Sequence, residues 1–210
     1  GTLKTTGEFT LDSDRGITLQ AASSIEVESS SNTLTYGGII SGSANLTKTG
    51  SGTLSLTGSN TYSGTTTISE GKISISADNN LGQSPASTTT GSLVLNGGSL
   101  FSTSNMTLNS DRGISLGASG GTIETESSTT LTYGGIIADS GAFTKSGAGT
   151  LLLSGANTYT GLTTISAGTL QVTGTLSDSA VINNQGTYDV DNSDTISRVY
   201  DTSGSPGNIE

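Results

Sequence analysis

Paired glutamates are the residues in this sequence whose spacing best suits catalysis. Glu26 and Glu28 lie two positions apart, and Glu124 and Glu126 repeat the pattern. On a β-strand, residues i and i+2 share a face about 6.5–7 Å apart, within reach of the carboxylate separation of glycoside hydrolases. The simpler interpretation is that each Glu-x-Glu marks the solvent face of a strand whose isoleucine points inward. We favour the simpler one, because no Trp is present to stack on a sugar ring.

Two missing residue types exclude most other enzymatic chemistry. The chain has no Cys, so it forms no disulfide, thiolate nucleophile or cysteine-bound metal site. It has no His, so the usual general base is missing and a Ser-His-Asp triad cannot be assembled. We therefore predict no catalytic residues, no cofactor and no bound metal.

Oxygen-rich segments nevertheless offer candidate calcium ligands. They are Asp12, Asp14, Asp111 and the run Asp189-Val190-Asp191-Asn192-Ser193-Asp194. None matches an EF-hand loop or the Gly-Gly-x-Gly-x-Asp repeat of calcium-binding solenoids. Asp beside Gly or Asn commonly forms turns, and we favour that role here.

Four further pairs of positions have two interpretations each. Asp14-Arg15 and Asp111-Arg112 could recognise a ligand or form exposed ion pairs worth about 0–1 kcal/mol. Asn60 and Asn157 each precede Thr-Tyr, where Asn suits a turn by bonding its neighbouring backbone. Tyr62 and Tyr159 could be exposed binding aromatics, but we favour rings that cap the core.

The overall charge disfavours nucleic acid as a partner. The net charge is −10, and only 7 of the 210 residues are Lys or Arg, scattered along the chain. Phosphate binding requires clustered basic residues. No stretch approaches the roughly 20 apolar residues of a membrane span, so we expect any membrane anchor to lie outside this chain. We interpret the chain as a fragment of a longer rod.

The elements that position these residues are short strands. Apolar pairs at i, i+2 recur every few residues, as in Phe9/Leu11, Ile17/Leu19, Ile25/Val27, Leu34/Tyr36, Leu54/Leu56 and Ile73/Ile75. Alternation with period two is typical of strands, and Gly, Asn, Ser and Asp separate the pairs as turn formers. Leu, Ile, Val and Phe make up only about a fifth of the chain, a level at which disorder must be considered. The periodicity argues against disorder.

The sequence also repeats itself over a long period. Asp14-Arg15-Gly16-Ile17 recurs as Asp111-Arg112-Gly113-Ile114, an offset of 111 − 14 = 97, and Tyr36-Gly37-Gly38-Ile39-Ile40 recurs at the same offset. Three strand-and-turn segments of about 8 residues make a coil of roughly 24, so each copy holds about four coils. We predict an all-β fold, a right-handed parallel β-helix (β-solenoid) of about eight coils. A propeller or an immunoglobulin-type sandwich is disfavoured by the few aromatics and the missing Trp and Cys.

This architecture makes two geometric predictions. Residues 97 apart should lie on the same face about four coils apart, which would align Arg15 with Arg112 and Tyr62 with Tyr159. Ile68 and Ile165, which end Thr-Thr-Ile segments, should point into the core.

A longer composite pattern carries a family resemblance. It runs from Lys48-Thr49-Gly50-Ser51-Gly52-Thr53-Leu54 through Asn60-Thr61-Tyr62-Ser63-Gly64 to Gly71, and again from Lys145-Ser146-Gly147-Ala148-Gly149-Thr150-Leu151 through Asn157-Thr158-Tyr159-Thr160-Gly161 to Leu170. Both copies resemble the passenger-associated β-strand repeat of bacterial autotransporters (type V secretion). The segments 77–82 and 93–98 resemble the links between such repeats in giant surface adhesins. The resemblance covers roughly residues 1–173 and implies a right-handed parallel β-helix, secreted across the outer membrane and displayed on the bacterial cell surface.

The resemblance also implies an organisation and a function. We expect a first repeat copy over residues 1–97, a second over 98–173, and diverged final coils of the same solenoid over 174–210. The expected function is a non-catalytic structural and adhesive stalk that binds a host-cell, matrix or glycan receptor or associates with itself between cells. An ice- or surface-binding solenoid is the alternative, suggested by Thr65-Thr66-Thr67 and Thr88-Thr89-Thr90. A polysaccharide-active β-helix enzyme is a more distant alternative.

Overall fold

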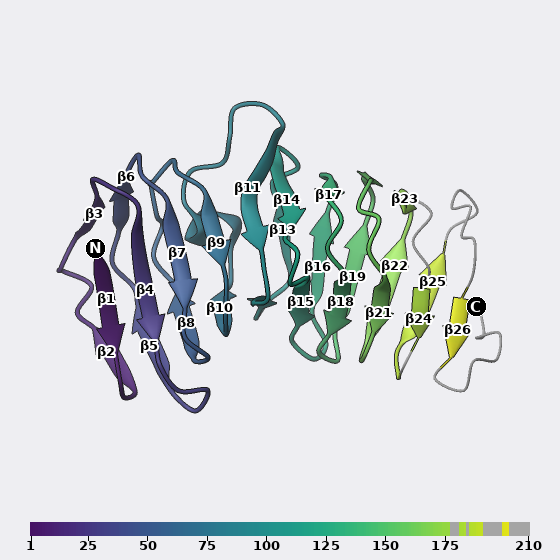
Figure 1. Ribbon diagram of the computed structural model, residues 1–210, viewed down its shortest axis with the longest axis horizontal. Helices are drawn as coiled ribbons and strands as arrows, with labels where there is room; N and C mark the ends of the chain where they lie inside the picture. The colour runs from purple at the N-terminus through teal and green to yellow at the C-terminus, as the bar shows by residue number, and fades with distance from the viewer. Residues whose placement is uncertain (177–180, 184, 191–198, 202–210) are drawn as a thin grey trace.

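The computed structural model shows an elongated parallel β-solenoid (Figure 1). The structure describes residues 1–176, 181–183, 185–190 and 199–201. Within these ranges the chain winds through about eight turns, and every strand pairs in parallel with strands of the turns beside it. The predicted all-β solenoid is therefore confirmed. Its right-handed winding stays a prediction.

The chain winds around three faces, and most turns place a strand on each of them. The first face is a seven-stranded sheet of β1 (Thr2–Thr5), β4 (Ser23–Val27), β7 (Leu46–Thr49), β9 (Thr66–Ile68), β11 (Thr89–Leu95), β14 (Arg112–Leu116) and β17 (Ile137–Ala138). The second is a ten-stranded sheet of β2 (Phe9–Leu11), β5 (Thr33–Tyr36), β8 (Thr53–Leu56), β10 (Lys72–Ile75), β12 (Ser99–Ser102), β15 (Gly121–Thr125), β18 (Phe143–Ser146), β21 (Thr163–Ile165), β24 (Val181–Asn183) and β26 (Val199–Asp201).

The third face is less regular than the other two. It begins with the pair β3 (Ile17–Leu19) and β6 (Ile40–Gly42), continues through the 3-10 helix η1 (Asp78–Leu81), and ends in a five-stranded sheet of β13 (Met106–Leu108), β16 (Thr130–Tyr133), β19 (Thr150–Leu153), β22 (Thr169–Val172) and β25 (Thr187–Val190). A last short pair, β20 (Ala156–Asn157) and β23 (Thr175–Leu176), lies instead next to β17 and extends the first face. Within the described ranges, η1 is the only helix, and no helix is long and apolar enough to cross a membrane.

The core is a stack of aliphatic side chains in register. In β8, Leu54 and Leu56 are buried while Thr53 and Ser55 between them face outward, as alternation on a strand requires. Leu54 pairs with Leu34 on one side and Ile73 on the other, so like side chains lie above one another through successive turns. Many strands therefore bury only two residues in a narrow core, and few large apolar residues suffice. Ile68 and Ile165 are fully buried, as predicted.

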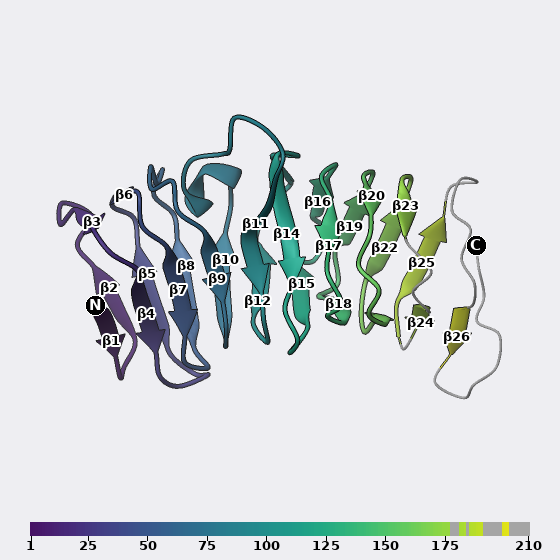
Figure 2. The ribbon, with the colours of Figure 1, turned by 45° about the horizontal axis from the view of Figure 1, so that its top comes forward.

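The turns differ in length, and one is markedly longer than its neighbours. Leu46, Thr66, Leu93, Ile114 and Ile137 succeed one another in register on the first face. Successive numbers differ by 20, 27, 21 and 23 residues. The 27-residue turn contains η1 and a loop that leads to β11, and this loop projects from the body of the solenoid in both ribbon views (Figures 1 and 2).

The relation between the two sequence copies differs from the prediction. Lys48 lies in β7 of the first face, but its counterpart Lys145 lies in β18 of the second face. Four turns along the first face take 137 − 46 = 91 residues, so an offset of 97 carries the chain four turns and then onward to the next face. The expectation that equivalent residues share a face is therefore wrong. The division of the chain at residues 97/98 and 173/174 stays a prediction, and part of the last segment lies outside the described residues.

Candidate functional site

The most unusual residues of the repeat are two lysines inside the solenoid. Lys48 and Lys145 are fully buried. Lys48 lies in register between Ile25 and Ile68 of the adjoining turns, in a column that is otherwise aliphatic. Lys145 lies likewise between Ile123 and Ile165.

Main-chain carbonyls satisfy the ammonium group of each lysine. Lys48 Nζ donates to the carbonyl oxygens of Thr49 at 2.8 Å, Gly50 at 2.6 Å and Glu70 at 3.3 Å. Because Glu70 lies one turn further along the chain, the side chain ties two turns together at a corner.

The second copy repeats this arrangement closely. Lys145 Nζ donates to the carbonyl oxygens of Ser146 at 2.7 Å, Gly147 at 2.8 Å and Ala167 at 3.2 Å. Burial lowers the pKa of both Lys48 and Lys145 to about 8, while nearby glutamates act weakly in the opposite sense.

The glycine after each lysine strand makes this corner possible. Gly50 and Gly147 both have a φ of 73°, in the left-handed region that side chains disfavour. A Cβ at either position would also lie 2.3 Å from a carbonyl oxygen of the preceding turn, Val27 or Thr125. The Lys-x-Gly spacing of the repeat is therefore a structural requirement of the corner.

The signature asparagines bond to other turns, which the sequence did not predict. Asn60 is buried; its Oδ1 accepts from the N–H of Ile40 at 2.8 Å, and its Nδ2 donates to the carbonyl of Asn80 at 2.6 Å. Asn157 likewise accepts from the N–H of Ile137 at 3.0 Å. Both side chains therefore connect strands of different turns, and a purely local turn role is wrong.

The signature tyrosines lie inside the core, as favoured. Tyr62 and Tyr159 are fully buried, and each hydroxyl shares a 2.6 Å hydrogen bond with a buried threonine four residues later, Thr66 or Thr163. Burial raises the pKa of Tyr62 to about 12. The Tyr159 ring also contacts the Phe143 ring, with centroids 5.7 Å apart. Neither tyrosine is available to a ligand.

The paired glutamates are engaged by lysines. Lys4 Nζ lies 2.9 Å from Glu26 and 3.2 Å from Glu28. Glu124 pairs with Lys72 at 2.6 Å. The isoleucine before Glu26 is buried, so the first pair lies on the outside of its strand. No described contact sets two of these carboxylates against each other as an acid and base pair would require.

Of the candidate aspartates, Asp12 forms a turn and Asp111 bonds to a residue of the preceding turn. Asp12 Oδ1 accepts from the N–H of Asp14 at 2.9 Å, the hydrogen bond of an Asx turn. Asp111 accepts from the Thr88 hydroxyl at 3.0 Å. The described residues contain no group of three or more acidic side chains that could hold a metal ion. Of the candidate tail segment, residues 191–194 lie outside the described part of the chain.

The two Asp-Arg-Gly motifs have different environments. Arg15 is exposed, but Arg112 is only 2% exposed, so the predicted alignment of the two arginines is wrong. Arg112 pairs with Asp78 of η1 and not with its neighbour Asp111: Nε lies 3.0 Å from Asp78 Oδ1, and Nη2 lies 3.1 Å from Oδ2. The sequence did not predict this pair, because Asp78 and Arg112 are 34 residues apart. Which residues become neighbours over that separation depends on the lengths of the turns between them.

Threonines align on one face without forming the expected arrays. Thr66, in the middle of the first triplet, points into the core. A column of four threonines does run down the third face in register, Thr130, Thr150, Thr169 and Thr187. The next outward column breaks the pattern with Leu152, Gln171 and Asp189.

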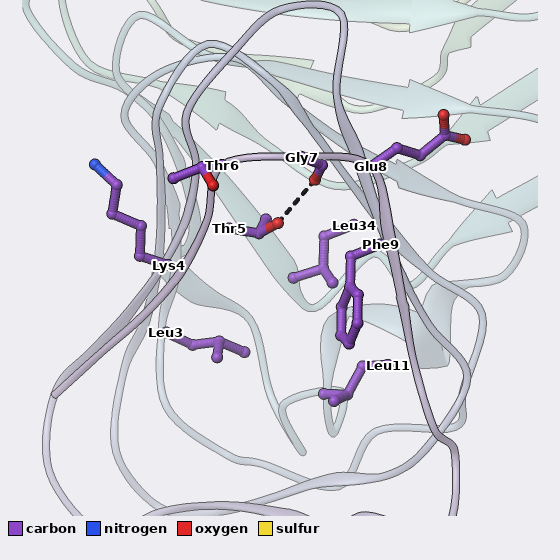
Figure 3. Close-up of a pocket in the computed structure, with 9 residues that line it drawn as sticks. All are labelled: Leu3, Lys4, Thr5, Thr6, Gly7, Glu8, Phe9, Leu11 and Leu34. Atoms are coloured by element: carbon purple, nitrogen blue, oxygen red, sulfur yellow. Dashed lines mark hydrogen bonds between the residues drawn. The ribbon is translucent and has the colours of Figure 1, made fainter.

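One pocket lies at the end of the solenoid where β1 and β2 are terminal strands. It has a volume of about 320 Å³ and is walled by Leu3, Phe9, Leu11 and Leu34, with Lys4 and Glu8 at its margin (Figure 3). Figure 3 shows the apolar side chains pointing toward one another and the charged ends pointing away. This is the end of the core stack, because Leu34 continues into the column described above. It brings no catalytic groups together.

Comparison with known proteins identifies the repeat. Residues 46–75 and 143–172 match the passenger-associated transport repeat, and these ranges begin just before the two buried lysines. The adhesin BmaC autotransporter of Brucella suis biovar 1 (strain 1330) is 42% identical over 138 residues, which are 65% of this chain and 4% of that protein. The chain thus spans a small part of the relative it matches. No solved structure matches the chain.

The matched repeats and their geometry agree. Each copy contains the same four features: a buried lysine, a left-handed glycine, an asparagine that bonds to neighbouring turns and a buried tyrosine. The chain contains two passenger-associated transport repeats, and over 65% of its length it is similar to part of an adhesin autotransporter.

Proposed function

We propose that this segment is a non-catalytic stalk of a bacterial surface adhesin, and that it contributes to attachment through its outward faces. One observation supports this proposal: both passenger repeats are built into one continuous parallel solenoid, and the residues that characterise each repeat hold its turns together. Lys48, Asn60 and Tyr62 face inward or bond to neighbouring turns, which leaves the outward side chains to meet other molecules.

Several features support a surface location. The relative is named as an adhesin autotransporter, and a passenger is the exported part of such a protein. A chain without Cys cannot be locked by disulfides before export. A solenoid needs only contacts between neighbouring turns, so it can fold progressively as it emerges. We expect the partner to be a host-cell, matrix or glycan surface, or a second copy on another cell.

The test is attachment of particles that carry the chain. Microspheres coated at graded densities with the purified chain are allowed to settle on epithelial monolayers and on matrix proteins, and detachment under flow is measured. Attachment should rise more steeply than the coating density, because weak sites act together on a surface. Absence of attachment at every density would reduce the segment to a spacer. Hydrolysis of any polysaccharide, abolished in a Glu26→Gln and Glu124→Gln double variant, would replace the adhesive function by an enzymatic one.

A second candidate function rests on the threonine column of the third face. Regularly spaced threonines on a flat sheet are the arrangement that an ice-binding solenoid would use, and Thr130, Thr150, Thr169 and Thr187 supply one such column. Measurement of thermal hysteresis in the purified chain tests it. The absence of thermal hysteresis would exclude the ice-binding function.

A further inference from the structure

The longest turn of the solenoid encloses a polar groove. Residues 82–88 leave the third face after η1 and return to β11 (Figures 1 and 2), and residues 63–65 line the same groove. The groove below this loop has a volume of about 300 Å³, at the small end of the range for ligand pockets. Its hydrogen-bonding side chains are those of Ser63, Thr65, Gln83, Ser84, Thr89 and Ser92.

A buried ion pair fixes the loop in place. Arg112 lines the groove, and its Nη1 donates to the carbonyl of Leu81 at 3.0 Å. Its Nη2 donates to the carbonyl of Gly82 at 3.1 Å and lies 3.4 Å from the Ser84 hydroxyl. Asp78 completes the arrangement by accepting from Ser84 at 2.6 Å and from the N–H of Asn109 at 3.0 Å. The wall of the groove is therefore held before any ligand arrives.

The chemistry of the lining selects a neutral ligand. The guanidinium of Arg112 is committed to Asp78 and to main-chain carbonyls, so it offers an anion little charge that is not already balanced. No carboxylate lines the groove, so it offers a cation no ligand set. What remains is a group of hydroxyls, one amide and a short apolar wall of Pro85 and Ala86. The hydroxyls of Ser84, Thr89 and Ser92 already donate within the chain, so they offer a ligand their acceptor positions.

We propose that this groove binds one or two residues of a neutral glycan. Sugar hydroxyls both donate and accept, as do the serine and threonine hydroxyls and the glutamine amide of the lining. Without an aromatic in the lining, affinity for a single glycan should be weak, in the high micromolar to millimolar range. This inference deepens the adhesive function proposed above and rests on it. The loop above the groove follows the first repeat. After the second repeat, the sequence at residues 175–179 is Thr-Leu-Ser-Asp-Ser, which does not repeat the Asp-Asn-Asn-Leu-Gly of residues 78–82.

The experiment compares a double variant of the groove with a single control variant at the position equivalent to Ser63. The purified chain is screened against immobilised neutral oligosaccharides with terminal galactose, mannose, fucose or N-acetylglucosamine, together with sialylated and sulfated controls, and the best binder is titrated in solution. Ser63→Ala with Gln83→Ala removes two exposed side chains of the groove. Thr160→Ala, 97 residues after Ser63 and also exposed, is the matched control. Equal thermal midpoints establish that all three proteins are folded.

We expect a neutral glycan to bind the natural chain and the Thr160→Ala control equally, and the double variant at least tenfold more weakly. Preference for charged glycans, unchanged binding by the double variant, or no binding at millimolar glycan would each overturn the proposal. The microsphere attachment assay distinguishes failure of the glycan-binding proposal from failure of the adhesive function. Attachment that persists in the double variant without any glycan binding would leave the adhesive function standing and remove the groove from it.

Discussion

At the scale of single residues, one core position differs informatively between the two copies. Thr125 is fully buried, and its hydroxyl has no hydrogen-bond partner among the described residues. The segment Ile25-Glu26-Val27-Glu28 of the first copy matches Ile123-Glu124-Thr125-Glu126 at an offset of 98 residues, so Val27 is the counterpart of Thr125, and it is also fully buried. A buried hydroxyl without a partner costs free energy that a methyl group of the same size does not.

We therefore expect Thr125→Val to raise the free energy of unfolding by about 1–2 kcal/mol. Chemical denaturation followed by circular dichroism measures the change. Val27→Thr is the reciprocal control and should lower stability by a similar amount. A Thr125→Val protein that is less stable than the natural one would mean that the hydroxyl has a partner after all.

The two buried lysines make stability depend on pH in an unusual direction. A free lysine titrates near 10.5, whereas burial lowers the pKa of Lys48 and Lys145 to about 8 in the folded chain. Below pH 8 both states carry the proton, and the cost of burying the charge is fully present. Between pH 8 and about 10 the unfolded state binds more protons than the folded state, so stability rises with pH. Above about pH 10 the trend reverses, because the raised pKa of Tyr62 then favours the unfolded state.

We expect the free energy of unfolding to increase from pH 8 to pH 10 in the natural chain. The increase should be lost in a Lys48→Met and Lys145→Met double variant, because Met has a side chain of similar length without a titrating group. Lys72→Met is the matched control, because Lys72 lies on the outside of β10 with 30% of its side chain exposed, and it should retain the increase. Equal slopes in all three proteins would show that the buried amines stay charged.

At the scale of elements, the Asp78–Arg112 pair holds η1 and the 82–88 loop to the solenoid. Burial alone would raise the pKa of Asp78, but hydrogen bonds from Arg112, Ser84 and the N–H of Asn109 outweigh it and lower the pKa below 3.8. Asp78→Asn leaves the guanidinium buried without its counter-charge, so it should cost about 3 kcal/mol. Hydrogen exchange should show faster exchange in residues 77–92 than elsewhere. Asp78→Asn with Arg112→Met should recover much of the loss, and a double variant as weak as the single one would contradict the pairing.

The columns of stacked aliphatic side chains also stabilise the strands. Ile68 and Ile165 are fully buried at equivalent strand ends, next to the buried lysines of the preceding turn. Replacement of either by Ala should cost about 2–5 kcal/mol, because the stacked strands on both sides limit collapse of the cavity. Thermal or chemical denaturation measures it. Losses below about 0.5 kcal/mol in both variants would mean that the columns tolerate voids.

The sequence predicted the strands better than the contacts between residues of different turns. Strands could be predicted because alternation in segments such as Leu54-Ser55-Leu56 depends only on neighbours. The inward direction of Lys48 could not, since a lysine normally marks the outer face, and its three carbonyl partners come from a corner that forms only when two turns are stacked. The Asp78–Arg112 pair was hidden for the same reason. The available signal for the buried lysines was the Lys-x-Gly pattern that recurs near the start of each repeat.

At the scale of the whole molecule, the repeat length decides how copies are presented. An offset of 97 residues advances four turns and one face, so each copy is rotated to the next side of the rod. Copies of this length in tandem would return to the same side only after three repeats. A surface feature that recurs with the repeat would therefore face in three directions around a stalk, which favours contact with a partner whatever the orientation of the rod.

Distances between spin labels test this rotation. The chain has no Cys, so labels can be attached at introduced cysteines alone. Thr47 and Ala138 belong to one outward column of the first face, four turns apart, and their Cα atoms should lie about 19 Å apart. Thr144 is 97 residues after Thr47 and lies in the same turn as Ala138, but on the second face. The Thr47→Cys and Thr144→Cys pair should therefore give a clearly longer distance than the Thr47→Cys and Ala138→Cys pair. Equal distances would show that the copies share a face, and the rotated presentation of the repeats would then be wrong.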